Sequence, residues 1–201
     1  MSTAEVPGPQ VGVASDVEAR LKNAGALLEG HFQLTSGRHS NRYVQCAQLL
    51  CQPAEAEAVC KALADRFRDT TVDIVLGPAL GGIVVAHEVA RSLGTPALFT
   101  ERKEGEMLLR RGFSIPKGAQ VLVVEDVVTT GGSVNEVLQL VRDAGGEVVG
   151  VGSIVQRAPE SPFDCRYESL LALDVVSWEP AECPLCAEGS TAVKPGSRPR
   201  Q

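Results

Sequence analysis

The sequence predicts an α/β fold in which helices cover both faces of a central, mostly parallel sheet. The first observation is that short β-branched runs alternate with helical patterns between residues 53 and 155. The second is the run 121–124, which contains only Val and Leu, as expected of a strand covered on both faces. The third is a composition of 44% apolar and 22% charged residues over 201 positions, which suits one globular domain.

The elements are expected in the following order. Residues 1–14 form a disordered N-terminus, rich in proline, glycine and small residues. Ser15 and Glu18 form a capping box that starts a helix, and residues 31–46 form a hairpin that turns at Ser36 and Gly37. Helices follow at 53–68, 82–93 and 133–144, and strands at 72–76, 96–100, 121–124 and 148–155. We therefore expect one domain over 15–175 and a C-terminal tail over 176–201.

Charge and hydropathy exclude several classes of protein. The net charge is −6 and the sequence pI is about 5.2, so nothing indicates a broad nucleic-acid-binding surface. The first 14 residues lack the basic start and apolar run of an export signal. No stretch approaches the roughly 20 apolar residues of a membrane span. We therefore expect a soluble, cytoplasmic protein with no nucleic-acid or membrane partner.

The six cysteines are interpreted as reduced thiols, because the sequence shows no sign of export. Cys183 and Cys186 form a single CxxC pair in the expected tail. A second pair at suitable spacing would predict zinc, and the sequence has none. The role of this pair therefore stays open, with metal and redox roles as alternatives to plain thiols.

The segment 121–133 (VLVVEDVVTTGGS) carries the most chemistry. An apolar strand runs into Glu125 and Asp126, and a turn of hydroxyl and glycine residues then leads into a helix. Glycines allow backbone N–H groups to approach an anion, and a helix N-terminus favours negative charge. The paired carboxylates suit sugar hydroxyls or magnesium, so the loop suits a ribose 5-phosphate. A capped helix start would explain the turn but not the carboxylates, and the segment is not a Walker loop.

This segment resembles the signature with which type I phosphoribosyltransferases bind 5-phosphoribosyl-1-diphosphate (PRPP). The resemblance implies their fold, with a small N-terminal hood at about residues 15–50. It also implies that Glu125 and Asp126 hold the ribose hydroxyls, with Asp126 catalytic, and that residues 129–133 hold the 5′-phosphate. The implied PRPP site in this segment is Glu125, Asp126, Val127, Val128, Thr129, Thr130, Gly131, Gly132 and Ser133. The earlier loop Ala79, Leu80, Gly81 and Gly82 would receive pyrophosphate, although glycine-rich turns of this kind are also common packing devices.

Five basic side chains lie within residues 102–117 of this net acidic chain: Arg102, Lys103, Arg110, Arg111 and Lys117. The Glu104-Gly105 and Arg111-Gly112 pairs indicate a hairpin or lid. Cations that close over a pyrophosphate leaving group assist its departure. We assign Arg102 and Lys103 to PRPP binding, with Lys103 catalytic. The other three are interpreted as a solvated, salt-bridged surface.

Further segments resemble the orotate phosphoribosyltransferase family in particular. Residues 31–40 (HFQLTSGRHS) resemble its hood motif, in which Arg38 and His39 position the hood, and residues 101–104 (ERKE) resemble its lid entry. Arg157 falls where that family places an arginine against the orotate carboxylate, a task that suits a planar guanidinium. Thr129 would contact the base as well. The alternative for Arg157 is an exposed charge at a strand end.

The resemblance covers roughly residues 25–175 and includes departures. Many members have a lysine where this chain has Thr35, and another where Gly81 stands. Their lid carries a further lysine and a histidine that residues 105–109 lack. The chain therefore resembles a divergent, short-lid branch.

The resemblance implies that orotate and PRPP give orotidine 5′-monophosphate and pyrophosphate, a step of UMP biosynthesis. Mg²⁺ would be carried by PRPP, with no direct protein ligand, and the protein would be a homodimer. Two alternatives stay open: a purine phosphoribosyltransferase acting on hypoxanthine, xanthine or adenine, and a non-catalytic regulator that senses PRPP.

Overall fold

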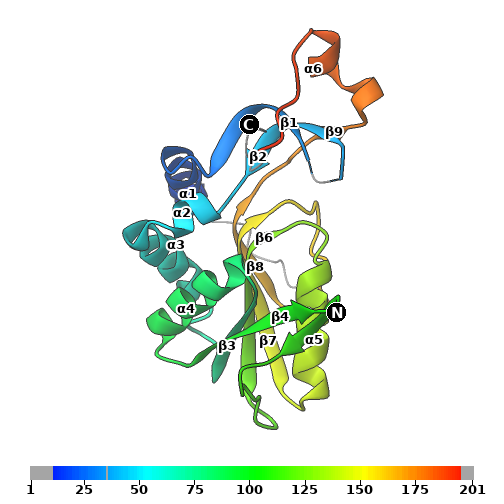
Figure 1. Ribbon diagram of the computed structural model, residues 1–201. Coiled ribbons are helices and arrows are strands. Elements are labelled where there is room, and N and C mark those ends of the chain that lie inside the picture. The colour runs from blue at the N-terminus through cyan, green and yellow to red at the C-terminus, as the bar shows by residue number, and fades with distance from the viewer. Residues whose placement is uncertain (1–10, 35, 196–201) are drawn as a thin grey trace, which may run out of the picture.

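The computed structural model describes residues 11–34 and 36–195, which contain two β-sheets. The larger sheet has six strands in the order β5-β4-β3-β6-β7-β8, and the smaller has three in the order β1-β2-β9 (Figure 1). The strands are β1 (Leu27–Gln33), β2 (His39–Val44), β3 (Ile74–Pro78), β4 (Ala97–Lys103), β5 (Glu106–Leu109), β6 (Gln120–Val128), β7 (Glu147–Gln156), β8 (Tyr167–Ala172) and β9 (Ser177–Trp178). The helices are α1 (Val11–Asn23), α2 (Ala47–Leu50), α3 (Pro53–Asp65), α4 (Gly81–Leu93), α5 (Gly132–Asp143) and α6 (Pro184–Ala187), with a 3-10 turn at Pro180–Glu182.

The large sheet is parallel except at its edge, where β5 pairs antiparallel with β4. Alternate residues of β6 face opposite sides, and each side has its own apolar core. Leu122 and Val124 pack with α1, α3 and α4, whereas Val121 and Val123 pack with α5. This double burial explains why the run 121–124 has no polar residue, and it confirms the predicted fold class.

The observed elements differ from the predicted ones mainly at their ends. Helix α1 begins at Val11, so Ser15 lies inside the helix and does not start it. The rest of the expected N-terminal tail, residues 1–10, lies outside the described residues. Strand β6 continues to Val128, so both carboxylates of the loop segment belong to the strand. Strands β8 and β9 were not predicted, because their residues lack a clear alternation of apolar and polar side chains.

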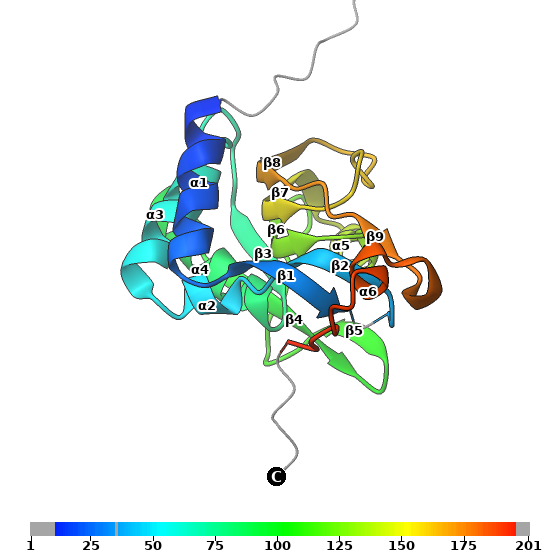
Figure 2. The ribbon, with the colours of Figure 1, turned by 90° about the horizontal axis from the view of Figure 1, so that it is seen from above.

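The small sheet, termed the hood, lies over the carboxyl ends of the parallel strands (Figures 1 and 2). It consists of the predicted hairpin β1–β2, completed by β9 from the C-terminal tail. Loops that leave the carboxyl ends of β3, β6 and β7 therefore lie beneath the hood. Ligands of open α/β sheets bind at these ends. Within the described residues, no helix is both long and apolar enough to cross a membrane.

Candidate active site

Glu125 and Asp126 lie side by side near the carboxyl end of β6. The amide of Asp126 donates to Glu125 Oε1 (3.0 Å), and the amide of Val127 donates to Asp126 Oδ1 (2.9 Å). Burial raises the pKa of Glu125 to about 9, and the neighbouring Asp126 contributes to the rise. Glu125 is therefore neutral near pH 7 unless a bound group stabilises its charge. A carboxyl group held in this way can hydrogen bond to a hydroxyl or bind a cation.

Residues 129–133 connect β6 to the start of α5, and we term this segment the cradle. Gly131 adopts a left-handed conformation (φ 76°) as the N-cap residue, and a Cβ there would lie 2.7 Å from Pro162 Cγ. Only glycine fits this position without displacing the neighbouring loop. Thr129, Thr130 and Ser133 are exposed around the turn. Hydroxyl groups and the first amides of a 12-residue helix are groups that bind phosphate.

The loop after β3 lies directly against Asp126. Gly81 and Gly82 begin α4, and a Cβ on Gly81 would lie 2.4 Å from Asp126 Oδ2. The Ala79–Leu80 peptide is cis, the Ala79 amide donates to Thr100 O (2.8 Å), and the Leu80 side chain is 83% exposed. The structure thus brings together the two loops that the sequence predicted for pyrophosphate and for ribose phosphate.

Arg157 follows β7 and borders the same cradle. Its amide donates to Val128 O (2.8 Å), which places it beside the start of the 129–133 loop. Its Nε is buried, and no described residue accepts a hydrogen bond from it. Burial lowers the pKa of Arg157, and Tyr43 on hood strand β2 opposes this effect. A half-buried guanidinium whose Nε lacks a partner is costly, so this site favours an anionic ligand.

The lid residues form the β4–β5 hairpin, which turns at Glu104 (φ 55°) and Gly105 (φ 92°). Two consecutive positive φ values are typical of the two-residue turn that connects the strands of a β-hairpin. Arg102 pairs with Glu136 on α5 (2.5 Å) and donates to Gly105 O (2.7 Å). Lys103 is exposed, and its ion pair within the described chain is a long one to Glu104 (3.9 Å). Among the described residues, no hydrogen bond or ion pair joins Arg102 or Lys103 to the cradle.

The remaining basic residues of the segment occupy surface positions. Arg110 and Arg111 both bind Glu101, whose pKa is lowered by the hydrogen bond from Arg111. Lys117 lies at the other end of the sheet, beside Gly145. His87 is an exposed residue of α4. These positions agree with the interpretation of these side chains as solvated surface.

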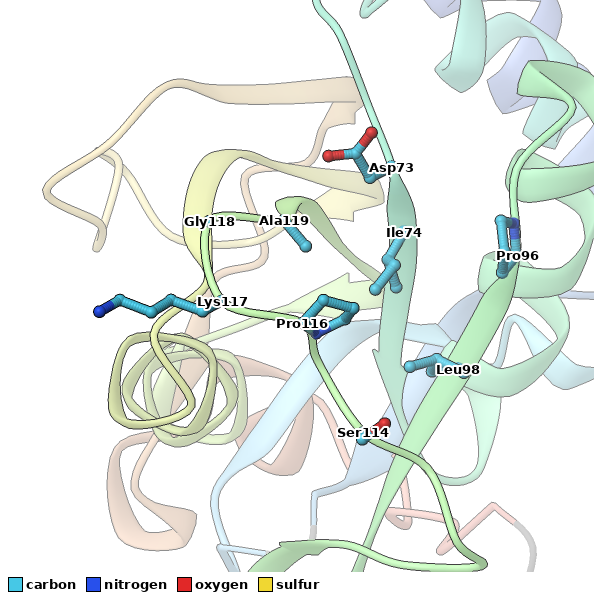
Figure 3. Close-up of a pocket in the computed structure, with 9 residues that line it drawn as sticks. All are labelled: Asp73, Ile74, Pro96, Leu98, Ser114, Pro116, Lys117, Gly118 and Ala119. Atoms are coloured by element: carbon cyan, nitrogen blue, oxygen red, sulfur yellow. The ribbon is translucent and has the colours of Figure 1, made fainter.

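A cavity of about 520 Å³ lies at the amino ends of the parallel strands, away from the cradle (Figure 3). Its walls come from the starts of β3 and β4 and from residues 114–119, and the Lys117 side chain points out of it. Asp73 at its rim accepts a hydrogen bond from the Gln120 amide (2.8 Å). This cavity lacks the loops that enter helices, so it is not the candidate active site.

The sequence did not reveal one cluster of polar side chains. His31, which has no evident partner in the sequence, contacts His39, Cys183 and Cys186 in the structure. The signal present in the sequence was a pair of histidines in one hairpin and a distant CxxC pair. Nothing in the sequence showed that the tail returns to that hairpin.

Comparison with known proteins agrees with this geometry. Residues 45–168 match the family model described as a phosphoribosyl transferase domain. The orotate phosphoribosyltransferase of Desulforamulus reducens is 57% identical over 175 residues, which cover 87% of this chain and 92% of that protein. The orotate phosphoribosyltransferase of Pelotomaculum thermopropionicum is 54% identical, with 91% and 97% covered. The crystal structure of Mycobacterium tuberculosis orotate phosphoribosyltransferase superposes with a TM-score of 0.66 at 26% identity, covering 81% of this chain and 96% of that one.

Proposed function

This chain belongs to the orotate phosphoribosyltransferases of the phosphoribosyl transferase family, and we propose that it transfers ribose 5-phosphate from PRPP to orotate. The products are orotidine 5′-monophosphate and pyrophosphate, and the step serves UMP synthesis. The relatives that support this activity are more than half identical and are matched over nearly their full length.

The observation that carries the base assignment is the unpartnered Nε of Arg157. It is buried, it has no acceptor among the described residues, and it lies beside the loop assigned to the ribose phosphate. Orotate bears a carboxylate, which a planar guanidinium binds through two parallel hydrogen bonds. We assign Thr129, one residue beyond Val128, to contact the same base. A purine base has no carboxylate and would leave Arg157 unpaired, so this position favours orotate over the purine alternative.

PRPP binding is assigned to the two adjoining loops. Glu125 and Asp126 hold the ribose hydroxyls, residues 129–133 hold the 5′-phosphate, and residues 79–82 receive pyrophosphate. Mg²⁺ prefers oxygen ligands and commonly keeps water and substrate phosphate ligands, so the phosphates of PRPP can carry the ion while Glu125 and Asp126 hold the ribose hydroxyls. Mg²⁺ bound with PRPP would neutralise charge on the departing pyrophosphate. We assign it no direct protein ligand and treat it as carried by the substrate.

The protein residues act by positioning and by charge, with no covalent nucleophile. Bond breaking at the anomeric carbon develops positive charge on the ribose, and we assign the Asp126 carboxylate to stabilise it. Lys103 and Arg102 would have to move toward the pyrophosphate loop, since they lie on an exposed hairpin. Closure of that hairpin and the hood would exclude water. The non-catalytic regulator alternative predicts PRPP binding without turnover.

The test is a spectrophotometric assay with Mg²⁺ and PRPP that follows loss of orotate, with hypoxanthine, xanthine, adenine and uracil in parallel. We expect consumption of orotate alone. Arg157→Gln should raise the KM for orotate about 10- to 100-fold, the value of a charged hydrogen bond, with little change in the KM for PRPP. Arg142→Gln is the matched control, because Arg142 makes an exposed pair with Asp164. Turnover of a purine, or an unchanged orotate KM in R157Q, would contradict the base assignment.

A homodimer and a cytoplasmic location complete the proposal. The homodimer rests on the family resemblance, in which the lid of one subunit reaches across to the other. The β4–β5 hairpin, exposed at the edge of the large sheet, is the segment that would do so (Figure 1). Light scattering on the purified protein should give twice the chain mass, and the mass of one chain would contradict this part of the proposal.

A further inference from the structure

The C-terminal segment is built into the hood. Strand β9 pairs with β2, and Arg38 donates hydrogen bonds to Ser177 Oγ (3.0 Å) and Ser177 O (2.7 Å). Further along, the Val193 amide donates to His31 O, and the Gln33 amide donates to Val193 O (both 2.8 Å). The segment between these two attachments carries α6 and the CxxC pair.

Four potential metal ligands meet between the hairpin and this segment. His31 Nε2 lies 3.0 Å from His39 Nδ1, 3.4 Å from Cys183 Sγ and 3.8 Å from Cys186 Sγ. Cys186 Sγ lies 3.3 Å from His39 Nδ1, and all four ligand atoms lie within 4.8 Å of one another. His31, His39 and Cys183 are buried, and none of the cysteines forms a disulfide.

Hydrogen bonds among these four side chains cannot by themselves account for their close approach. His31 Nε2 faces three polar atoms, yet a ring nitrogen offers either one hydrogen or one lone pair. A cation at the centre would bond to all four atoms at once. A tetrahedral zinc ion, with bonds of about 2.0 Å to nitrogen and 2.3 Å to sulfur, holds its ligand atoms about 3.3–3.8 Å apart. Most of the observed separations lie in or near that range.

We propose that His31 Nε2, His39 Nδ1, Cys183 Sγ and Cys186 Sγ bind one Zn²⁺. Two thiolates and two imidazoles form a Cys₂His₂ set, and such soft ligands select zinc over magnesium. On binding, both thiols release their protons to solvent, so two thiolates balance the charge of the ion. With four protein ligands the site is closed to substrate, and its role is structural.

The surroundings of the cluster agree with this assignment. His31 Nδ1 lies 3.2 Å from Ser190 Oγ, so it can donate its hydrogen there and leave the Nε2 lone pair for the metal. Metal-binding histidines usually fix their tautomer in this way. Cys183 is the N-cap residue of α6 and Cys186 lies within that helix, so the short turn directs both sulfurs to one side.

Zinc at this position would fasten the tail to the hairpin that covers the active site. Its ligands come from β1, from β2 and from residues separated from them by about 150 positions. Strand β2 also carries Tyr43, which is close enough to Arg157 to raise the pKa of that residue. The ion would therefore hold the strand beside Arg157 in place. The inference needs only the cluster and does not depend on the proposed reaction.

The first test measures metal in the full-length protein, purified without a metal-affinity tag. Mass spectrometry of metals should find one Zn²⁺ per chain, and exchange with Co²⁺ should give the visible absorption bands of tetrahedral, thiolate-bound cobalt. Wild-type protein that holds no zinc after refolding with Zn²⁺ in the presence of a reductant would overturn the proposal.

Variants locate the ion. Cys186→Ser and His39→Asn should each lower the zinc content at least about tenfold and remove the cobalt bands. Cys51→Ser is the matched control, because Cys51 is exposed and lies outside the cluster, and it should retain both signals. If C186S fails to fold, the wild-type metal content and cobalt spectrum decide the question. Full zinc content in folded C186S and H39N would show that the ion binds elsewhere.

Discussion

The backbone of Gly81 lies against the carboxylate of Asp126, so closely that a Cβ on Gly81 would lie 2.4 Å from Oδ2. Gly81 is the first residue of α4 and Asp126 lies near the end of β6, and these are the two segments assigned to pyrophosphate and ribose. The contact sets the position of the carboxylate relative to both loops. It also indicates that a side chain at position 81 requires Asp126 to move.

Gly81→Ala should therefore displace Asp126 while leaving the core intact. A shift of about 1 Å in a positioning group can cost about 100-fold, so we expect kcat/KM for PRPP to fall about 10- to 100-fold. Steady-state kinetics and circular dichroism measure the two effects. Gly12→Ala is the control, since it adds the same methyl group at an exposed position of α1, outside both loops. If G81A has the kinetics of the wild type, the position of Asp126 relative to Gly81 does not affect kcat/KM for PRPP.

Asp126→Asn keeps the shape of the side chain and removes its charge. If the carboxylate stabilises charge on the ribose, the variant should raise the KM for PRPP or lower kcat, with an unchanged unfolding midpoint. Asp143→Asn, at the far end of α5, is the control. Unchanged kinetics in D126N would remove Asp126 from the site, whatever G81A does.

Glu125 should make the stability of the ligand-free protein depend on pH. Its pKa rises from 4.5 to about 9 on folding, chiefly through burial. Below pH 4.5 the Glu125 carboxyl group is protonated in both the folded and the unfolded state, so its titration does not change the free energy of unfolding. As the pH rises toward 9 the unfolded state loses the proton first, so the free energy of unfolding falls by up to about 1.4 kcal/mol per pH unit.

Glu125→Gln removes this titration. Urea unfolding between pH 5 and 9 should show a decline in wild-type stability that is smaller in E125Q, with the variant more stable by on the order of a few kcal/mol near pH 9. The same variant should bind PRPP more weakly, because an amide cannot become a carboxylate. Parallel pH profiles for the two proteins would contradict the raised pKa.

The basic residues of the lid segment should differ in how strongly their substitution lowers kcat. Lys103→Gln should lower kcat, because the proposed closure brings this ammonium to the leaving group. Arg111→Gln is the matched variant from the same segment, where the guanidinium binds Glu101 on the surface. It should leave kcat within about twofold, as expected for an exposed pair. Equal losses in both variants would favour a general effect of charge in this segment.

The central layers are predictable from the sequence because their patterns are local. The apolar run of β6, the glycines after β3 and β6 and the amphipathic helices each depend on neighbouring residues alone. The hairpin of β1 and β2 is equally visible, with Gly37 at its turn. The fold class and both candidate phosphate loops therefore follow from the order of residues along the chain.

Features that depend on distant pairing are not predictable in this way. Nothing in the dipeptide Ser177-Trp178 indicates that it pairs with β2, and nothing in the CxxC pair indicates His31 and His39 as neighbours. The sequence predicts Arg157 at a strand end, but only the three-dimensional packing shows that its buried Nε has no hydrogen-bond partner among the described residues.

The pairing of β9 with β2 also determines when the hood can form during synthesis. Strand β2 leaves the ribosome before its partner β9, which lies more than 130 positions later in the chain. The large sheet, which closes within residues 74–172, can assemble before that partner exists. The entropy cost of closing a loop grows only slowly with its length, so this long separation does not prevent the pairing once both strands are present. The nascent chain should thus acquire its phosphate loops first and the covering of its base pocket last.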